Sequence, residues 1–174
     1  SEVIHAGIQY KPGGVRASLA VKGRDMLYAF CAEHHVNHAR CGKLLVATSA
    51  GDVPKLAALK EKAEKNGVAD LTIISAEDAA ALEPGLRSFG AISSPSSGIV
   101  DSHGLMLALL GEVENHGGAL AVSSPVTGGR VQGDGIELDV GGADPVTLKA
   151  KTVVNCAGLW SDRVARSIDG IPDD

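Results

Sequence analysis

The sequence predicts an α/β fold, which becomes α+β if the 174 residues are classified by themselves. Hydrophobic residues make up 44% of the chain, which is enough to fill a packed core. Up to residue 123, short apolar runs typical of strands alternate with segments of helical period. From Val126 onward, short alternating runs of apolar and polar residues are separated by glycines, a pattern typical of antiparallel strands.

The first part of the chain is predicted to alternate between strands and helices after an ordered loop. The first helix is predicted from apolar residues at helical spacing, although Gly23 weakens the pattern. Asn66-Gly67 is a typical left-handed helix stop, and Ser75 followed by Asp78 is typical of a capping box. The expected elements are a loop over 1–15, a helix over 16–34, a strand over 43–48, a helix from 52–54 to 66–67, a strand over 71–74, a short helix after 75–78 and a strand over 89–93.

Asp101 precedes a Leu-rich segment that is predicted to be a helix over about 102–116, ending at Gly117-Gly118. A carboxylate at this position accepts the free N–H groups of the first turn. Asp101 is also a candidate catalytic group, but capping is the commoner use of such a residue, and we favour it. A strand is expected to follow over 119–123.

The last part of the chain is predicted to hold a three-stranded antiparallel meander, a final strand and a helix. The final strand is expected to be buried because its centre is apolar, which would also leave Cys156 buried and inert. The meander strands are expected around 130–131, 136–140 and 146–148, the final strand over 152–156, the turn at 157–158 and the helix over about 160–168.

Composition argues against several classes of function. Lys plus Arg is 16 and Asp plus Glu is 21, so the net charge of −5 is unlike a nucleic-acid-binding surface. Aromatic residues are only 3%, which disfavours base stacking and aromatic sugar platforms. No apolar run reaches the length of a membrane span, and the first residues do not resemble a signal peptide. Three cysteines do not suggest a disulfide framework, so a reducing, cytoplasmic compartment is expected.

A group of potential zinc ligands lies close together in the sequence, at Cys31, His34, His35, His38 and Cys41. Zinc binds both Cys and His. The spacing matches no standard zinc finger, however, and the identity of the ligands alone does not establish a site. We therefore expect no native metal, and a metal-binding protein remains an alternative.

The segment 153–165, VVNCAGLWSDRVA, is predicted to be a strand that turns at a glycine into a helix. Gly158 lets the backbone come close to a bulky ligand, and the start of the helix offers free N–H groups to an anion. The same pattern occurs in ordinary strand-to-helix turns. The residues by themselves leave both interpretations open.

Four segments of the chain together resemble one enzyme family. In order, they are SEVIHAGIQY (1–10), CGKLLVAT (41–48), SPSSGIVDS (94–102) and VVNCAG-LWSD (153–162). They are similar, in the same order, to segments of the D-amino-acid oxidase and glycerol-3-phosphate dehydrogenase superfamily, above all to the L-2-hydroxyglutarate dehydrogenases. The resemblance covers essentially the whole chain, and it is the combination of the four segments that makes it specific.

The resemblance implies an FAD cofactor and the middle part of a two-domain flavoprotein. Residues 1–100 would supply a flavin-facing loop and part of the substrate domain, and residues 101–174 would return to the FAD-binding domain. The family's Gly-x-Gly-x-x-Gly loop, which binds the FAD pyrophosphate, does not occur here, since Leu138 follows Gly133 and Gly135 at the third position. We therefore expect an internal part of a larger enzyme that is inactive by itself. The implied cofactor contacts are Ser1, Gly7, Val126, Ala157, Gly158 and Trp160.

The resemblance also implies that the larger enzyme oxidises a 2-hydroxy acid, similar to 2-hydroxyglutarate, to a 2-oxo acid by hydride transfer to flavin. It places His5 near the flavin, where a neutral imidazole suits removal of the hydroxyl proton. The alternative is a His5 that bonds the cofactor or packs structurally. Tyr10 either holds the carboxylate of this small-molecule substrate or lines the loop.

Other substrates and roles stay open at this point. The superfamily shares its fold across substrates, so oxidation of an amino acid or a glycerol phosphate is an alternative. A binding module of α/β fold without enzymatic activity is another. The sequence does not indicate whether the electrons pass on to oxygen, a quinone or another acceptor.

Overall fold

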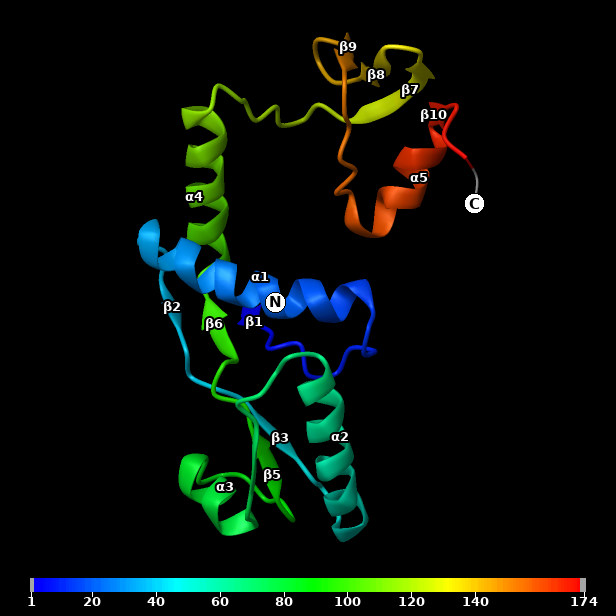
Figure 1. Cartoon of the computed structure of the whole chain (residues 1–174). Coiled ribbons are helices and arrows are strands. Elements are labelled where there is room, and N and C mark those ends of the chain that lie inside the picture. The colour runs from blue at the N-terminus through cyan, green and yellow to red at the C-terminus, as the bar shows by residue number, and fades with distance from the viewer. Residues whose placement is uncertain (1, 173–174) are drawn as a thin grey trace. The chain divides into compact units, whose positions relative to one another are not determined.

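The structure is a computed structural model that describes residues 2–172. It is a mixed α/β structure, as predicted, and it divides into two compact units, Ser1–Gly117 (unit 1) and Gly118–Asp174 (unit 2) (Figure 1). Each unit is described by itself. None of the helices in the described part combines the length and apolarity needed to cross a membrane.

Unit 1 contains two small antiparallel sheets, each of three strands. The order of the first sheet is β1-β6-β2, and the order of the second is β3-β5-β4. In the first sheet Ile4 lies opposite Gly98, which joins the start of the chain to a strand more than ninety residues later. The strands are β1 Val3–Ile4, β2 His38–Ala39, β3 Leu44–Val46, β4 Thr72–Ile74, β5 Ala91–Ser93 and β6 Gly98–Val100.

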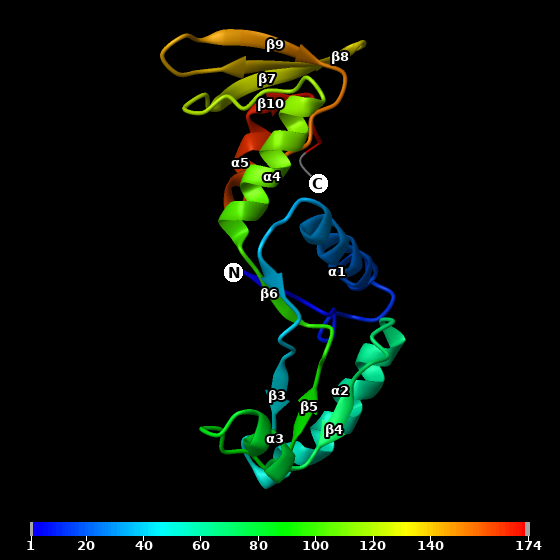
Figure 2. The ribbon, with the colours of Figure 1, turned by 90° about the vertical axis from the view of Figure 1, so that its left-hand side faces the viewer.

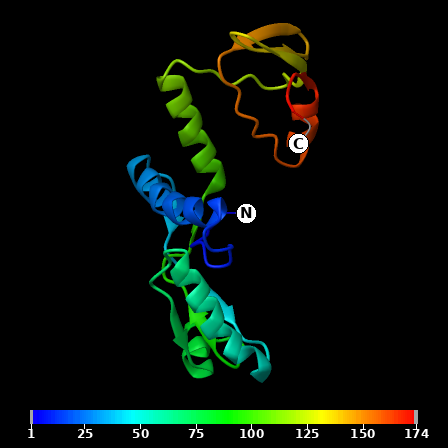
Figure 3. The same cartoon turned by 45° about the vertical axis from the view of Figure 1, so that its right-hand side comes forward.

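The helices of unit 1 cover these sheets and enclose two apolar cores. In Figures 1 and 2, α1 lies beside the β1-β6-β2 sheet, and Figure 3 shows α2 running along the β3-β5-β4 sheet. The helices are α1 Val15–Glu33, α2 Val53–Lys65, α3 Ala76–Leu82 and α4 Ser102–Asn115. The first core contains Ala6, Ile8, Ala47, Leu56, Ala63, Val68, Leu71 and Ile92. The second core contains Ile4, Tyr28, Cys31, Val36 and Val100.

The helix ends of unit 1 follow the predicted signals. Helix α2 ends at Asn66, and Gly67 follows with a φ of 88°. Ser75 and Asp78 form the reciprocal capping box at the start of α3. The Asp101 carboxylate caps α4 as predicted, because its Oδ1 accepts bonds from the backbone N–H groups of the first turn.

Unit 2 contains the predicted meander. Strands β7 Val126–Gln132, β8 Gly135–Val140 and β9 Val146–Ala150 pair antiparallel in sequence order. A further strand, β10 Ile168–Asp169, pairs parallel to β7 at its other edge. The turn η2 Gly158–Trp160 leads into helix α5 Ser161–Arg166, close to the predicted helix.

Two predicted strands are wrong. Residues 119–123 and 152–156 have no strand structure, and Val154 and Cys156 are exposed rather than buried. An apolar run becomes a strand only when a neighbouring strand pairs its N–H and C=O groups, and no described strand does so here. The loop expected over 1–15 also needs correction, because it begins with strand β1.

Candidate functional site

The segment His5–Tyr10, which we call the His5–Tyr10 loop, continues directly from strand β1. Ala6 and Ile8 anchor it in the first core of unit 1, and Ile4 just before it lies in the second core. Ile4, Ala6 and Ile8 are buried, whereas His5 and Gln9 between and after them are exposed. An extended chain directs successive side chains to opposite sides. Burial of Ile4 and Ala6 on either side therefore turns the His5 imidazole outward from the core.

A pocket of about 270 Å³ lies beside this loop. All six residues of the loop line it, together with Lys43 and Leu45 from the second sheet. Gly7 is buried within the loop at a φ of 98°, and a Cβ there would come within 3.1 Å of Val21 on α1. The pocket therefore combines an imidazole, a phenol and an ammonium group on a backbone that packs closely against a helix.

Lys43 is the member of this pocket that sequence reasoning missed. Two backbone hydrogen bonds with Ser94 hold it: Lys43 N–H donates to Ser94 C=O at 3.1 Å, and Ser94 N–H donates to Lys43 C=O at 2.9 Å. None of the ion pairs formed within residues 2–172 involves its ammonium group. The available signal was its position as the single cation of the CGKLLVAT segment. Lys43 can therefore attract an anionic ligand without first breaking an ion pair with another described side chain.

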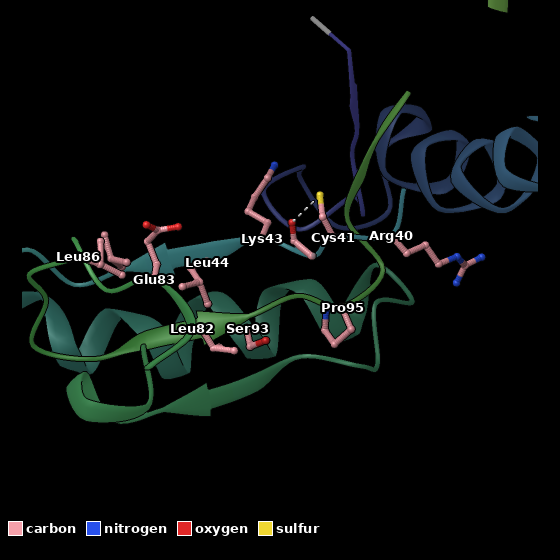
Figure 4. A pocket seen from close by; sticks show the side chains of 11 residues that line it. Arg40, Cys41, Lys43, Leu44, Leu82, Glu83, Leu86, Ser93 and Pro95 are labelled. Atoms are coloured by element: carbon pink, nitrogen blue, oxygen red, sulfur yellow. Dashed lines mark hydrogen bonds between the residues drawn. The ribbon is translucent and has the colours of Figure 1, made fainter. Parts of the chain in front are cut away.

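Lys43 also lines a second pocket of about 570 Å³, next to the end of α3 (Figure 4). Glu83 and Leu86 lie at its other end, and Cys41 donates a weak bond to the Gly42 carbonyl. Arg40 points away from Lys43 in Figure 4, and its guanidinium stacks 3.9 Å from the Tyr28 ring centroid. Arg40 is therefore engaged with an aromatic ring, whereas Lys43 also lines the pocket that contains His5.

Unit 2 has an apolar pocket of about 260 Å³ where the meander meets the predicted cofactor turn. Val126 and Ala157, two of the predicted cofactor residues, both line it. Asn155 holds the turn, because its Oδ1 accepts a bond from Ala157 N–H at 3.2 Å and its Nδ2 donates to Ser161 C=O at 2.8 Å. The remaining lining residues are Leu138, Val153, Val154, Cys156, Val164 and Ile168.

Gly158 and Trp160 lie just beyond this pocket. Gly158 has a φ of 59°, and a Cβ built on it would meet no atom within 4 Å. The Trp160 ring is 58% exposed and carries the Arg163 guanidinium 4.6 Å from its centroid. The space beside Gly158 and one part of the Trp160 ring are therefore open to solvent. Ser1, the remaining predicted cofactor residue, lies outside the described residues.

The Cys and His side chains between Cys31 and Cys41 are dispersed. Cys31 lies in the second core, where burial raises the pKa of its thiol, whereas Cys41 is exposed. The His34 ring stacks on Phe30 with 4.1 Å between centroids. Nowhere in the described part of the chain do three potential metal ligands come together. The expectation that no metal is needed stays a prediction.

The chain matches the family model described as FAD dependent oxidoreductase over residues 1–173. It is 38% identical over 176 residues to the mitochondrial L-2-hydroxyglutarate dehydrogenase of Nematostella vectensis, 35% over 182 residues to that of Homo sapiens and 39% over 169 residues to that of Caenorhabditis elegans. These matches cover 95%, 99% and 95% of the chain. The chain spans 39% of the length of each of these relatives.

Solved structures share the fold. Glycine oxidase from Geobacillus kaustophilus aligns with 96% of the chain and 46% of its own length, at a TM-score of 0.81 and 22% identity. L-alpha-glycerophosphate oxidase from Mycoplasma pneumoniae, solved in its dithionite-reduced form with FAD bound, aligns with 97% of the chain and 45% of its own length, at a TM-score of 0.82 and 22% identity.

Proposed function

Because the chain belongs to the family of FAD-dependent oxidoreductases, we propose that the whole protein uses FAD to oxidise a 2-hydroxy acid to a 2-oxo acid. Relatives that are 33% to 39% identical and carry the name L-2-hydroxyglutarate dehydrogenase support this substrate class. The observation that carries the proposal within the structure is the pocket shared by His5, Tyr10 and Lys43. It pairs a proton acceptor, the His5 imidazole, with a cation suited to a carboxylate, the Lys43 ammonium.

The reaction removes a proton from the substrate hydroxyl and a hydride from the adjacent carbon. A bound FAD would supply the acceptor for the hydride. A neutral imidazole accepts a proton near pH 7, so we assign the hydroxyl proton to an unprotonated ring nitrogen of His5. The Lys43 ammonium and the Tyr10 hydroxyl are assigned to the substrate carboxylate, since both can donate hydrogen bonds to it. The product is the 2-oxo acid, with the proton left on His5.

The residues of unit 2 fit part of FAD. The apolar pocket lined by Val126 and Ala157 suits a flat aromatic ring, and the open space beside Gly158 allows close approach of a large group. The exposed face of Trp160 offers a further apolar surface. We propose these residues, together with Gly7 and Ser1, as the cofactor contacts contributed by this chain.

The proposed roles of His5 and of the cofactor contacts also suggest a division of the chain into two domains. We propose that residues 1–100 contribute the flavin-facing loop and part of the substrate domain, and that residues 101–174 belong to the FAD-binding domain. The pocket with His5 and Lys43 lies within the first range, and the pocket with Val126 and Ala157 lies within the second. We propose that the pocket with His5 and Lys43 binds the small-molecule substrate and that the pocket with Val126 and Ala157 binds part of the cofactor.

Oxidation of an amino acid or a glycerol phosphate is the alternative. Glycine oxidase and L-alpha-glycerophosphate oxidase share the fold, and the Lys43 ammonium suits a phosphate as well as a carboxylate. Turnover of the whole protein with a panel of 2-hydroxy acids, amino acids and glycerol phosphates separates these classes. Binding of any of them without flavin reduction would instead indicate a module without enzymatic activity.

The compartment is a separate proposal. Cys31, Cys41 and Cys156 are all free thiols, which fits the reducing, cytoplasmic compartment expected from the sequence. The relatives, however, are named as mitochondrial proteins. Fractionation of cells that express the whole protein decides between the two.

The substitution His5→Asn in the whole protein tests the proposed base. Asn keeps some hydrogen bonding but cannot usefully accept the hydroxyl proton, so kcat should fall by about a hundred- to ten-thousandfold while flavin stays bound. The lower limb of the pH–rate profile should disappear with the imidazole, because that limb reports the essential base. Steady-state kinetics from about pH 5 to 9 and the flavin absorbance provide the measurements.

His35→Asn is the matched control, since His35 is exposed, lies outside both pockets and has a φ of 55° that Asn tolerates. It should leave turnover unchanged. Near-normal turnover and an unchanged pH profile in His5→Asn would reject His5 as the base. Loss of flavin from the same variant would assign His5 to cofactor binding.

A further inference from the structure

The end of helix α2 holds the His5–Tyr10 loop by hydrogen bonds to its backbone. The Asn66 side chain is buried, and its Nδ2 donates to Gly7 C=O at 3.1 Å and to Tyr10 C=O at 3.0 Å. One turn earlier, Lys62 Nζ donates to Gln9 C=O at 2.8 Å. Helix α2 therefore binds three carbonyl groups within one stretch of four residues.

The amide of Asn66 suits the chemistry of these bonds. Both loop partners are carbonyl oxygens, which only accept hydrogen bonds, so the group that faces them must carry two N–H donors. The Asn66 Oδ1 atom is buried and finds no donor among the described residues. Both donors of the amide thus bond the loop, whereas its acceptor has no bond to any described group.

These bonds matter because the loop is not paired in a sheet. Strand β1 ends at Ile4, and beyond it the backbone of the loop is secured by Ala6 and Ile8 in the first core and by the donors of α2. Gly7 and Tyr10 bracket the turn of the loop. Their shared donor, Asn66, therefore sets the distance between Gly7 and Tyr10, the two ends of the turn within the segment that lines the pocket.

We infer that Asn66 is a positioning residue for the oxidation proposed above: it fixes the backbone from which His5 and Tyr10 reach the substrate. This role rests on the proposed function of His5, and Asn66 itself is not among the residues that line the pocket. Displacement of a catalytic group by about 1 Å can lower turnover by about a hundredfold. A buried amide behind the loop can accordingly affect catalysis without a direct contact.

The first test is local and needs no turnover. In the 174-residue chain, Asn66→Ala removes both donors, and amide hydrogen exchange in the His5–Tyr10 loop should speed up by roughly ten- to hundredfold. Asn66→Asp, which keeps the size of the side chain but presents a carboxylate to the two carbonyls, should have the same effect near pH 7. Lys65→Ala is the control, because it removes an exposed ion pair with Glu61 on the same helix but no bond to the loop, so exchange in the loop should stay unchanged.

The second test uses the whole protein. Asn66→Ala and Asn66→Asp should lower kcat by about ten- to hundredfold, with a smaller change in KM and with flavin content unchanged. Lys62→Ala removes one exposed donor and should have a clearly smaller effect on both exchange and kcat. Circular dichroism of each variant verifies that α2 still forms.

The outcomes separate this inference from the proposed function. Unchanged exchange in the loop of both Asn66 variants would overturn the anchoring role, whatever His5→Asn does. Faster exchange with unchanged kcat, in a protein where His5→Asn is inactive, would overturn the positioning role and leave His5 as the base. Faster exchange together with the loss of kcat supports the inference.

Discussion

Lys43 lines two pockets at once, the pocket that contains His5 and Tyr10 and the pocket beside α3. Its backbone is fixed on both sides by Ser94, so the base of the side chain has a defined position. A hydrogen bond to a charged partner is worth about 1.5–3 kcal/mol, which corresponds to roughly a ten- to hundredfold change in affinity. If Lys43 binds the carboxylate of the substrate as proposed, its ammonium group should contribute about this much to the affinity.

Lys43→Met in the whole protein tests this role. Met keeps much of the apolar stem and removes the charge, so KM for a 2-hydroxy acid should rise by about tenfold or more, with a smaller change in kcat. Lys43→Arg should retain part of the affinity because the positive charge remains. Lys55→Met is the control, since Lys55 is exposed on α2 and paired with Asp52. Equal KM values for Lys43→Met and the unmodified protein would exclude Lys43 from substrate binding.

The sequence indicated only some of these residues. His5 and Tyr10 were predicted because they lie in a segment that resembles a family, and the structure places both beside one pocket, which leaves their roles as proposals. Asn66 was predicted only as a helix stop, and nothing in its local pattern indicates that its amide bonds a loop more than fifty residues away. A side-chain bond across that separation depends on how α2 and the loop pack, which local spacing does not encode.

At the scale of elements, α4 combines a side-chain cap with little burial. None of its residues is fully buried, and only Leu105 and Ala108 pack against the second core. Its first turn is satisfied by Asp101 Oδ1, which accepts from His103 N–H at 3.1 Å and from Gly104 N–H at 3.0 Å. This geometry is that of a cap, which agrees with the interpretation favoured from the sequence.

Asp101→Ala should therefore destabilise unit 1 by about 1 kcal/mol, within the range of about 0.5–2 kcal/mol known for such caps. Asp101→Asn should preserve most of the stability, since Asn is as good a cap as Asp. Urea denaturation monitored by circular dichroism measures both variants. Equal stabilities of Asp101→Ala and the unmodified protein would show that the cap contributes nothing and would reopen a functional role for Asp101.

Element prediction succeeded where local rules decide and failed where pairing decides. The ends of α2 and the capping box of α3 follow from residues that lie next to one another in the chain. Strands β1, β2 and β6 are two or three residues long, too short to show an alternation, and their pairing joins distant segments. The prediction of a strand over 152–156 was wrong for a different reason. Its pattern is apolar like that of a strand, but no strand among the described residues pairs with it.

At the scale of the whole molecule, the proposed FAD contacts of unit 2 do not make a complete cofactor site. Unit 2 offers the proposed contacts for FAD, but its apolar pocket measures only about 260 Å³. Pockets that enclose a ligand of drug size measure roughly 300–1,000 Å³, and FAD is larger than such ligands. The printed sequence also contains no Gly-x-Gly-x-x-Gly loop for the pyrophosphate. The 174 residues thus supply an incomplete enclosure for the cofactor.

The 174-residue chain should accordingly not retain FAD. After incubation with excess FAD and gel filtration, the protein peak should carry far less than one flavin per chain. Excess FAD should also leave its thermal melting temperature unchanged, because a ligand stabilises a fold only when its concentration approaches or exceeds Kd. The whole protein, treated in the same way, is the control and should elute with flavin. Stoichiometric flavin on the 174-residue chain would show that its own residues complete the cofactor site.

By itself, the sequence determined the α/β class, the positions of the main helices, the meander of unit 2 and, through its resemblance, the FAD-dependent family. The tertiary structure alone decided that Lys43 joins His5 in one pocket and that Asn66 bonds the loop. It also decided that Gly98 must lack a side chain, since a Cβ there would collide with the Tyr28 hydroxyl and the Ala39 carbonyl. The physical reason is the distance along the chain over which each interaction acts. Propensity, capping and alternation act between residues a few positions apart, whereas a pocket or a buried hydrogen bond requires segments that meet only after the chain has packed.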